Sequence, residues 1–103
     1  MELVYRYREL KDYKKFYEQF CIDTNYKRNL DMCDYENLCY SADFLNEYMF
    51  SCQDMNIHFK FIGFDLEKIN EAKTLNDMKW KSIFNVLGYF IKDYPNNTIE
   101  FVD

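Results

Sequence analysis

The residues able to carry out nucleophilic catalysis are few in this 103-residue chain. His58 is the only histidine, so it would have to serve as the general base. Acyl transfer requires a nucleophile within hydrogen-bonding reach of that base, usually on a turn that exposes it. No such turn surrounds any serine or cysteine, and His58 alternates with Ile57 and Phe59 as an outward-facing strand residue does. We therefore predict no catalytic residue and a protein that is not an enzyme. The nucleophiles considered are Ser41, Ser51, Ser82, Cys21, Cys33, Cys39 and Cys52.

The four cysteines also raise the alternatives of a metal site and of disulfides. Their spacing contains no C-x-x-C pair and there is no second histidine, whereas zinc sites need closely spaced ligands that converge. With two glycines the chain has no loop of the kind that binds phosphates, so we expect neither a metal nor a cofactor. The first residues lack the basic start and apolar middle of a signal peptide, so we expect a cytoplasmic protein with reduced thiols.

Carboxylates are concentrated in one stretch of the chain. Between Arg28 and Lys60 there are six acidic residues and no Lys or Arg, while the whole chain has a net charge of −5. Acids around a helix surface are normally solvated, which makes the paired carboxylates of a glycosidase a weak interpretation. Two interpretations remain: a face that keeps the protein soluble, or a surface that docks into a basic cleft. The predicted partner-binding residues are Asp31, Asp34, Tyr35, Glu36, Tyr40, Asp43, Glu47, Tyr48 and Asp54.

The elements that would hold these residues follow from hydrophobic periodicity. Alternation predicts strands near residues 2–8, 57–62 and 98–102, and helical spacing predicts helices over about 10–20, 35–53, 66–73 and 75–92. Asp34 is a suitable N-cap for the acidic helix, Asp65 for the third helix, and Thr74 begins a capping box for the last one. The chain is therefore predicted to form one α+β domain over residues 1–103, with a small sheet of about three strands packed against three to four helices.

Membranes and nucleic acids are unfavourable partners. The longest uncharged apolar run is far shorter than the ~20 residues that span a bilayer. Basic residues cluster within residues 6–28, but carboxylates interrupt the cluster and the whole molecule repels polyanions. This cluster has a second interpretation as a partner for the acidic helix of another copy, so self-association remains an alternative.

In size, acidity and lack of catalytic residues, the chain is similar as a class to two kinds of inhibitory protein. One is the immunity protein that neutralises a bacterial nuclease toxin; the other is the phage protein that blocks a defence system such as a CRISPR effector. We predict an immunity protein that occludes the basic active-site cleft of a toxin, with carboxylates in place of phosphates. The alternatives are an anti-CRISPR-type protein and a non-catalytic adaptor domain. The expected partner is a basic protein, either a nuclease toxin or another enzyme that handles nucleic acids.

Overall fold

The computed structural model of the chain describes residues 1–25 and 40–103. Along the chain it contains β1 (Glu2–Arg6), α1 (Tyr7–Leu10), α2 (Tyr13–Asp23), α4 (Ala42–Ser51), β2 (His58–Ile62), α5 (Leu66–Glu71), α6 (Leu75–Asp93) and β3 (Thr98–Val102). The predicted combination of three strands with helices, an α+β fold, is confirmed at the three predicted strand positions.

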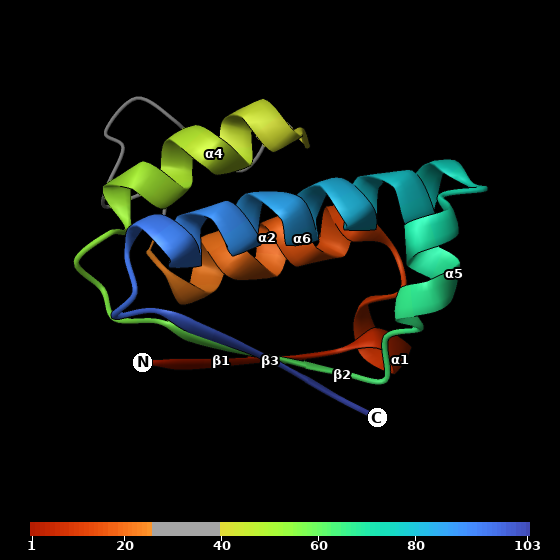
Figure 1. The fold of residues 1–103 in the computed structure, drawn as a ribbon, viewed down its shortest axis with the longest axis horizontal. Coiled ribbons are helices and arrows are strands. Elements are labelled where there is room, and N and C mark those ends of the chain that lie inside the picture. Colours follow the sequence, from red (N-terminus) through yellow and green to blue (C-terminus); the bar gives the residue numbers. More distant parts are fainter. Residues whose placement is uncertain (26–39) are drawn as a thin grey trace.

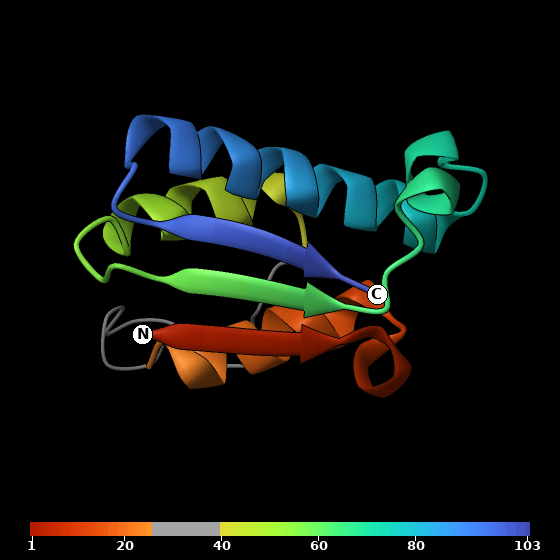
Figure 2. The ribbon, with the colours of Figure 1, turned by 60° about the horizontal axis from the view of Figure 1, so that its bottom comes forward.

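The three strands form one parallel sheet in the order β1-β2-β3 (Figure 2). In the register of this sheet, Tyr5 lies opposite Phe61, which in turn lies opposite Phe101. Parallel neighbours cannot be joined by a tight hairpin, so each connection crosses over through helices. The alternating sequences predicted the strands, but their parallel order follows from these crossovers.

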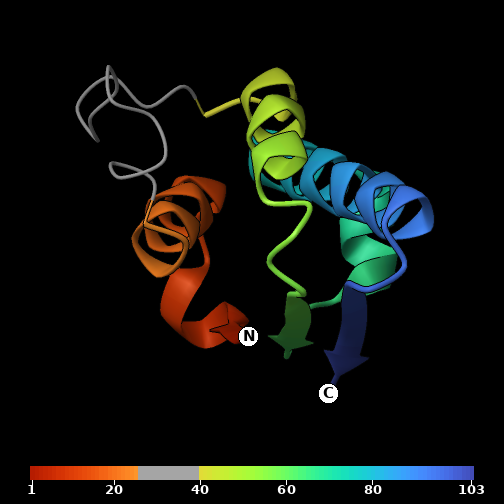
Figure 3. The ribbon, with the colours of Figure 1, turned by 90° about the vertical axis from the view of Figure 1, so that its left-hand side faces the viewer.

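The helices α2, α4 and α6 lie on one face of the sheet, and no described element covers the other face (Figures 1 and 3). Helices α2 and α6 lie nearer the sheet, and α4 lies over both on the side away from it. The strands alternate accordingly, with Leu3, Tyr5 and Phe59 buried under the helices. Their neighbours Glu2 and Thr98 are exposed on the open face.

Aromatic side chains dominate the core between the sheet and the helices. Trp80, Phe16 and Phe61 are fully buried, and Phe16 lies 5.6 Å from Trp80 between ring centroids. Phe84 meets Phe61 edge-on at 5.0 Å. Burying one such side chain stabilises the fold by roughly 1.5–3 kcal/mol, so these rings hold the helical layer on the sheet.

Side-chain caps explain where several helices begin. Asp65 accepts a hydrogen bond from the backbone N–H of Lys68, and Thr74 accepts one from that of Asp77, as the sequence predicted. Helix α6 then buries one stripe along its 19 residues. No helix within residues 1–25 and 40–103 is both long and apolar enough to cross a membrane.

A buried asparagine joins the starts of two strands. Asn97 is fully buried, and its side-chain oxygen accepts a 2.6 Å hydrogen bond from the backbone N–H of Ile57. Its side-chain nitrogen donates to the carbonyl of Tyr94 at 3.0 Å. The turn after α6 therefore supplies the hydrogen-bond acceptor for the backbone N–H of Ile57, just before β2. This bond holds the start of β3 beside the start of β2.

Several element boundaries differ from the sequence predictions; α5, for example, ends at Glu71 rather than at residue 73. β1 ends at Arg6, because the chain turns there into α1 and Tyr7 packs edge-on against Phe64 at 5.2 Å. The following helix starts at Tyr13 rather than at residue 10, after Asp12 as its N-cap. The acidic helix predicted over 35–53 is shorter: residues 40 and 41 are not helical, and α4 begins at Ala42 after its N-cap Ser41 and ends at Ser51. The predicted cap Asp34 lies outside the described residues.

Candidate functional site

Helix α4 presents carboxylates on the side away from the core. Leu45 and Met49 are buried against the neighbouring helices, because they recur at the spacing of one helix face. Asp43, Glu47 and Asp54 fall off that stripe and are exposed. We call these three residues the acidic face. The structure therefore exposes three of the predicted contact residues: Asp43 and Glu47 lie one turn apart on α4, and Asp54 lies in the turn that follows the helix.

The acidic face carries uncompensated negative charge. Within residues 1–25 and 40–103 the ion pairs are His58–Glu100 and Lys73–Glu71, and neither involves the acidic face. Asp43 lies in the first turn of α4, where the helix dipole favours a carboxylate. Glu47 lies in the middle of the helix and Asp54 in the turn after its C-terminal end, so neither gains from the dipole. Their like charges repel one another, so the arrangement does not serve the fold's own stability.

Tyr40 lies at the N-terminal end of α4 and is half-buried. Its ring meets Tyr17 of α2 edge-on at 6.0 Å, and Lys14 Nζ lies 5.7 Å from its centroid. Burial, and after it the neighbouring Glu18, raises the pKa of the Tyr40 hydroxyl. Tyr40 therefore stays a neutral phenol with one ring face held by α2.

Tyr48 is a correction to the predicted contact set. It is only 2% exposed, and its hydroxyl lies 2.6 Å from the hydroxyl of Thr24 at the end of α2. Its ring meets Phe20 edge-on at 5.6 Å. Because α4 packs against helices on both sides, the residue flanking its apolar stripe is buried as well. Tyr48 therefore belongs to the core and does not face a partner in this fold. The remaining predicted contact residues, Asp31, Asp34, Tyr35 and Glu36, lie outside the described residues.

The structure adds an aromatic groove beside the acidic face that sequence reasoning missed. Phe50 of α4 and Tyr89 of α6 are 63% and 69% exposed and line a groove of about 230 Å³. Asp93 contributes a further carboxylate to its wall. The sequence could have shown that Tyr89 is exposed, because it falls off the buried stripe of α6. Only the packing of α4 on α6 places it beside Phe50. Its other lining residues are Asn46, Met49, Phe90 and Tyr94.

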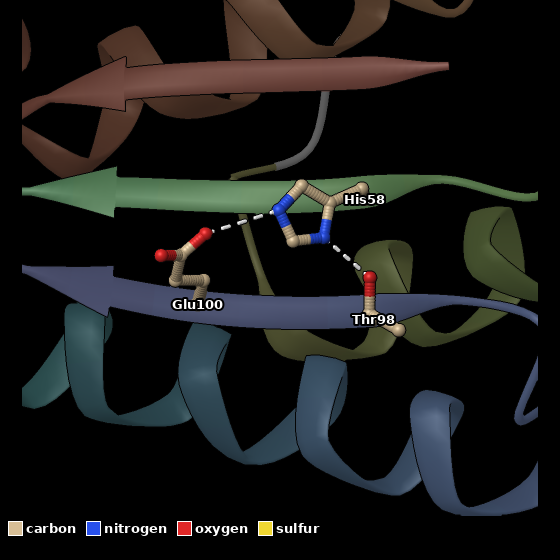
Figure 4. A network of polar contacts seen from close by, with 3 residues as sticks. All are labelled: His58, Thr98 and Glu100. Carbon is tan, nitrogen blue, oxygen red and sulfur yellow. Dashed lines mark hydrogen bonds and ion pairs between the residues drawn. The ribbon is translucent and has the colours of Figure 1, made fainter.

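A second polar cluster lies on the open face of the sheet (Figure 4). The Nδ1 atom of His58 is hydrogen-bonded to the hydroxyl of Thr98, and its Nε2 atom lies 3.2 Å from Glu100 Oε1. A carboxylate, a histidine and a hydroxyl are the residue types of a catalytic triad. The side chains of His58 and Glu100 are 35% and 49% exposed, on a flat sheet surface. The backbone N–H of Thr98 already donates to Ile57 O, as part of the sheet.

This cluster lacks what acyl transfer needs. An oxyanion requires free, converging N–H donors in a water-excluding site. Here the N–H of Thr98 is already used in the sheet, and the side chains of His58 and Glu100 are open to solvent. The four best-formed grooves along the described residues are lined by other side chains than those of His58, Thr98 and Glu100. The contacts link β2 to β3 across the open face, and this is the role that the geometry supports.

Neither metal-ligand geometry nor known relatives add a further assignment. Across the described ranges, no three His, Cys, Asp or Glu side chains converge as a ligand set would. Comparison of the chain with models of protein families, with curated proteins and with solved structures found no match. The acidic face and the groove beside it are therefore the candidate site that the structure itself supplies.

Proposed function

We propose that the chain is a non-catalytic inhibitory protein whose acidic face enters the basic substrate cleft of a nuclease, in the manner of a toxin immunity protein. The observation that carries the proposal is the exposed charge of Asp43, Glu47 and Asp54, which no basic side chain of the described residues neutralises. A cleft that binds nucleic acid is lined by Lys and Arg to receive phosphates. Carboxylates held at the right positions satisfy the same basic groups.

The position of α4 supports entry into a cleft. Of the described helices it lies farthest from the sheet, so its outer side faces away from the sheet (Figures 1 and 3). Leu45 and Met49 anchor it in the core, so Asp43 and Glu47 are carried on a helix rather than on a loop. A preorganised surface loses less conformational entropy on binding than a flexible one.

The neighbouring groove supplies the apolar part of such an interface. Exposed Phe50 and Tyr89 offer rings of the kind that anchor protein interfaces, beside the charged surface. Complementary charge speeds the encounter with a basic protein, and close charge pairs at such interfaces couple by about 1.5–7 kcal/mol. Fast association suits an inhibitor that must act before a nuclease does damage.

The test reverses charge on the acidic face and compares it with an equal reversal elsewhere. The variant Asp43→Lys with Glu47→Lys changes two exposed acids one helical turn apart. The control, Glu67→Lys with Glu71→Lys, makes the same change in charge at exposed positions with the same spacing in α5. Each protein is used as bait in nuclease-treated host lysate, and the captured protein is then purified and assayed for nucleic-acid cleavage.

We expect wild type and the α5 control to bind and inhibit one basic nuclease stoichiometrically. The α4 variant should bind it more than about 100-fold more weakly, which is about 2.7 kcal/mol. Equal affinity of the two double variants would refute the role of the acidic face. A captured partner without nuclease activity would refute the immunity role, and a nucleic-acid-guided defence effector as partner would favour the phage anti-defence alternative.

A further inference from the structure

A second groove runs along the outer edge of the sheet, apart from the acidic face. It has a volume of about 670 Å³, almost three times that of the groove beside α4. One wall is the free edge of β1, and the other is formed by α1 and α2. Leu3, Tyr5 and Leu10 form its buried floor, and Val4 and Ile22 contribute exposed apolar surface. The groove therefore joins an unpaired strand edge to an apolar lining.

The hydrogen-bond register shows which backbone groups face this groove. The N–H of His58 donates to the carbonyl of Met1 at 2.8 Å, so Glu2 is the residue opposite His58. In a parallel ladder, alternate residues of a strand pair with one neighbour and the residues between them face away. Glu2 and Val4 therefore direct their N–H and C=O groups to the groove, and within the described part of the chain no element pairs with them.

This edge lacks the devices that usually prevent pairing. Natural edge strands are blunted by proline, by a bulge, by lysine or by a covering element. β1 contains neither proline, lysine nor a bulge, although it is short and carries the charges of Glu2 and Arg6, and its five residues pair with β2 in unbroken register. The helical wall is held in place, because Asp23 accepts a 3.1 Å hydrogen bond from the hydroxyl of Tyr5 and a 2.9 Å one from Gln19. The Tyr5–Asp23 hydrogen bond thus ties α2 to β1 beside the groove.

The groove's composition indicates what occupies it. Its charged lining residues are the acids Glu2, Glu9, Glu18 and Asp23 and the bases Arg6 and Lys15, a net charge of −2. An added strand directs alternate side chains to the two faces of the sheet. On the helical side they meet the acids Glu9, Glu18 and Asp23 with the base Lys15, which account for the whole net charge of −2. On the open side they pass Val4 between Glu2 and Arg6, whose charges cancel. Basic side chains therefore fit the helical side and apolar side chains the open side. The matching occupant alternates apolar and basic residues.

We propose that β1 accepts, by strand addition, an extended segment of a partner protein in which apolar and basic residues alternate. Main-chain hydrogen bonds to Glu2 and Val4 supply the pairing, and the carboxylates of the groove select the charge. A second copy of the chain fits less well, because it brings together two grooves of the same negative charge. This surface is separate from the acidic face, so the proposal does not depend on the nuclease partner.

The test uses a blocked octapeptide of alternating valine and lysine, with a valine–glutamate octapeptide as its control. Binding is followed by the backbone amide NMR signals of the full-length protein. The lysine peptide should shift the Glu2 and Val4 signals saturably, and the glutamate peptide should not. No saturable shift in β1, equal binding of both peptides, or shifts confined to the acidic face would overturn the proposal.

Two kinds of variant sharpen the result. Val4→Pro removes an outward N–H that the sheet does not use, a place where an edge strand tolerates proline, and should weaken binding at least 10-fold. Val4→Thr keeps that N–H and should bind as wild type does. Glu9→Lys with Glu18→Lys leaves the strand intact and should also weaken binding at least 10-fold, which keeps the test valid if the proline variant does not fold. Unchanged affinity in this charge variant, or a protein dimer formed through β1, would contradict the proposed occupant.

Discussion

Replacing Tyr48 by phenylalanine tests whether this residue belongs to the core or to the contact surface. Its hydroxyl lies 2.6 Å from the Thr24 hydroxyl and 3.3 Å from the Thr24 carbonyl, and both residues are at most 2% exposed. The Thr24 hydroxyl donates its own proton to Phe20 O at 2.7 Å, so Tyr48 supplies the second proton of this network. Tyr48→Phe keeps the ring and removes that one donor.

The expected cost is that of one well-formed buried hydrogen bond with its acceptor left behind, about 1–2 kcal/mol. For a chain of this size the urea m-value is about 1–2 kcal/mol/M, so the unfolding midpoint should fall by roughly 1 M with the m-value unchanged. The fluorescence of Trp80, the chain's single tryptophan and a fully buried one, reports the transition. Tyr89→Phe is the control, because the Tyr89 side chain is 69% exposed and its hydroxyl should contribute little.

The same variants separate packing from binding. If Tyr48 is a core residue, Tyr48→Phe should bind the nuclease partner with the affinity of wild type once it is folded. A Tyr48→Phe variant as stable as the Tyr89→Phe control would refute the assigned hydrogen bond. A Tyr48→Phe variant that keeps full stability but loses affinity would show that Tyr48 contacts the partner.

Two further predictions concern the backbone and the thiols. Gly63 has φ +79° whereas Gly88 lies inside α6 with open space around it, so Gly63→Ala should destabilise by about 1–2 kcal/mol and Gly88→Ala should stabilise by about 0.5–1 kcal/mol in urea unfolding. Burial raises the pKa of Cys21 to about 12 and that of Cys52 to about 11, and burial also raises the pKa of the Tyr5 hydroxyl. These groups ionise at a lower pH in the unfolded chain than in the fold. Their contribution to the free energy of unfolding is therefore fully present below the ordinary thiol pKa of 9.0 and is lost as pH rises towards 11–12. Unfolding free energy measured from pH 8 to 11 should therefore fall, and thiol labelling of native protein at pH 8 should be slow for both cysteines; a flat profile or rapid labelling would contradict their burial.

Local pattern was sufficient to predict most of the elements. Strands such as β2 alternate between buried and outward residues, and helix starts at Asp65 and Thr74 depend on side chains that bond the first turn. These signals act between residues a few positions apart, so they can be recognised without the fold. The end of β1 was harder to predict, because the turn at Tyr7 depends on Phe64, which is distant in sequence.

The candidate site was predictable only in part, for the same reason. Charge along the chain marks the acidic stretch, and helical spacing alone places Asp43 and Glu47 outside. Whether a residue flanking the apolar stripe is buried depends on how many neighbours the helix has. Tyr48 is buried because Thr24 and Phe20 of α2 cover it as well.

The sequence by itself determined the positions of the strands, the amphipathic helices and the segregation of negative charge, since each depends on short-range spacing and residue type. The tertiary structure decided the parallel strand order, the groove between Phe50 and Tyr89, and the open edge of β1. These features arise where segments far apart in the chain pack together. Burial and hydrogen-bond partners are properties of that packing, and no local pattern encodes them.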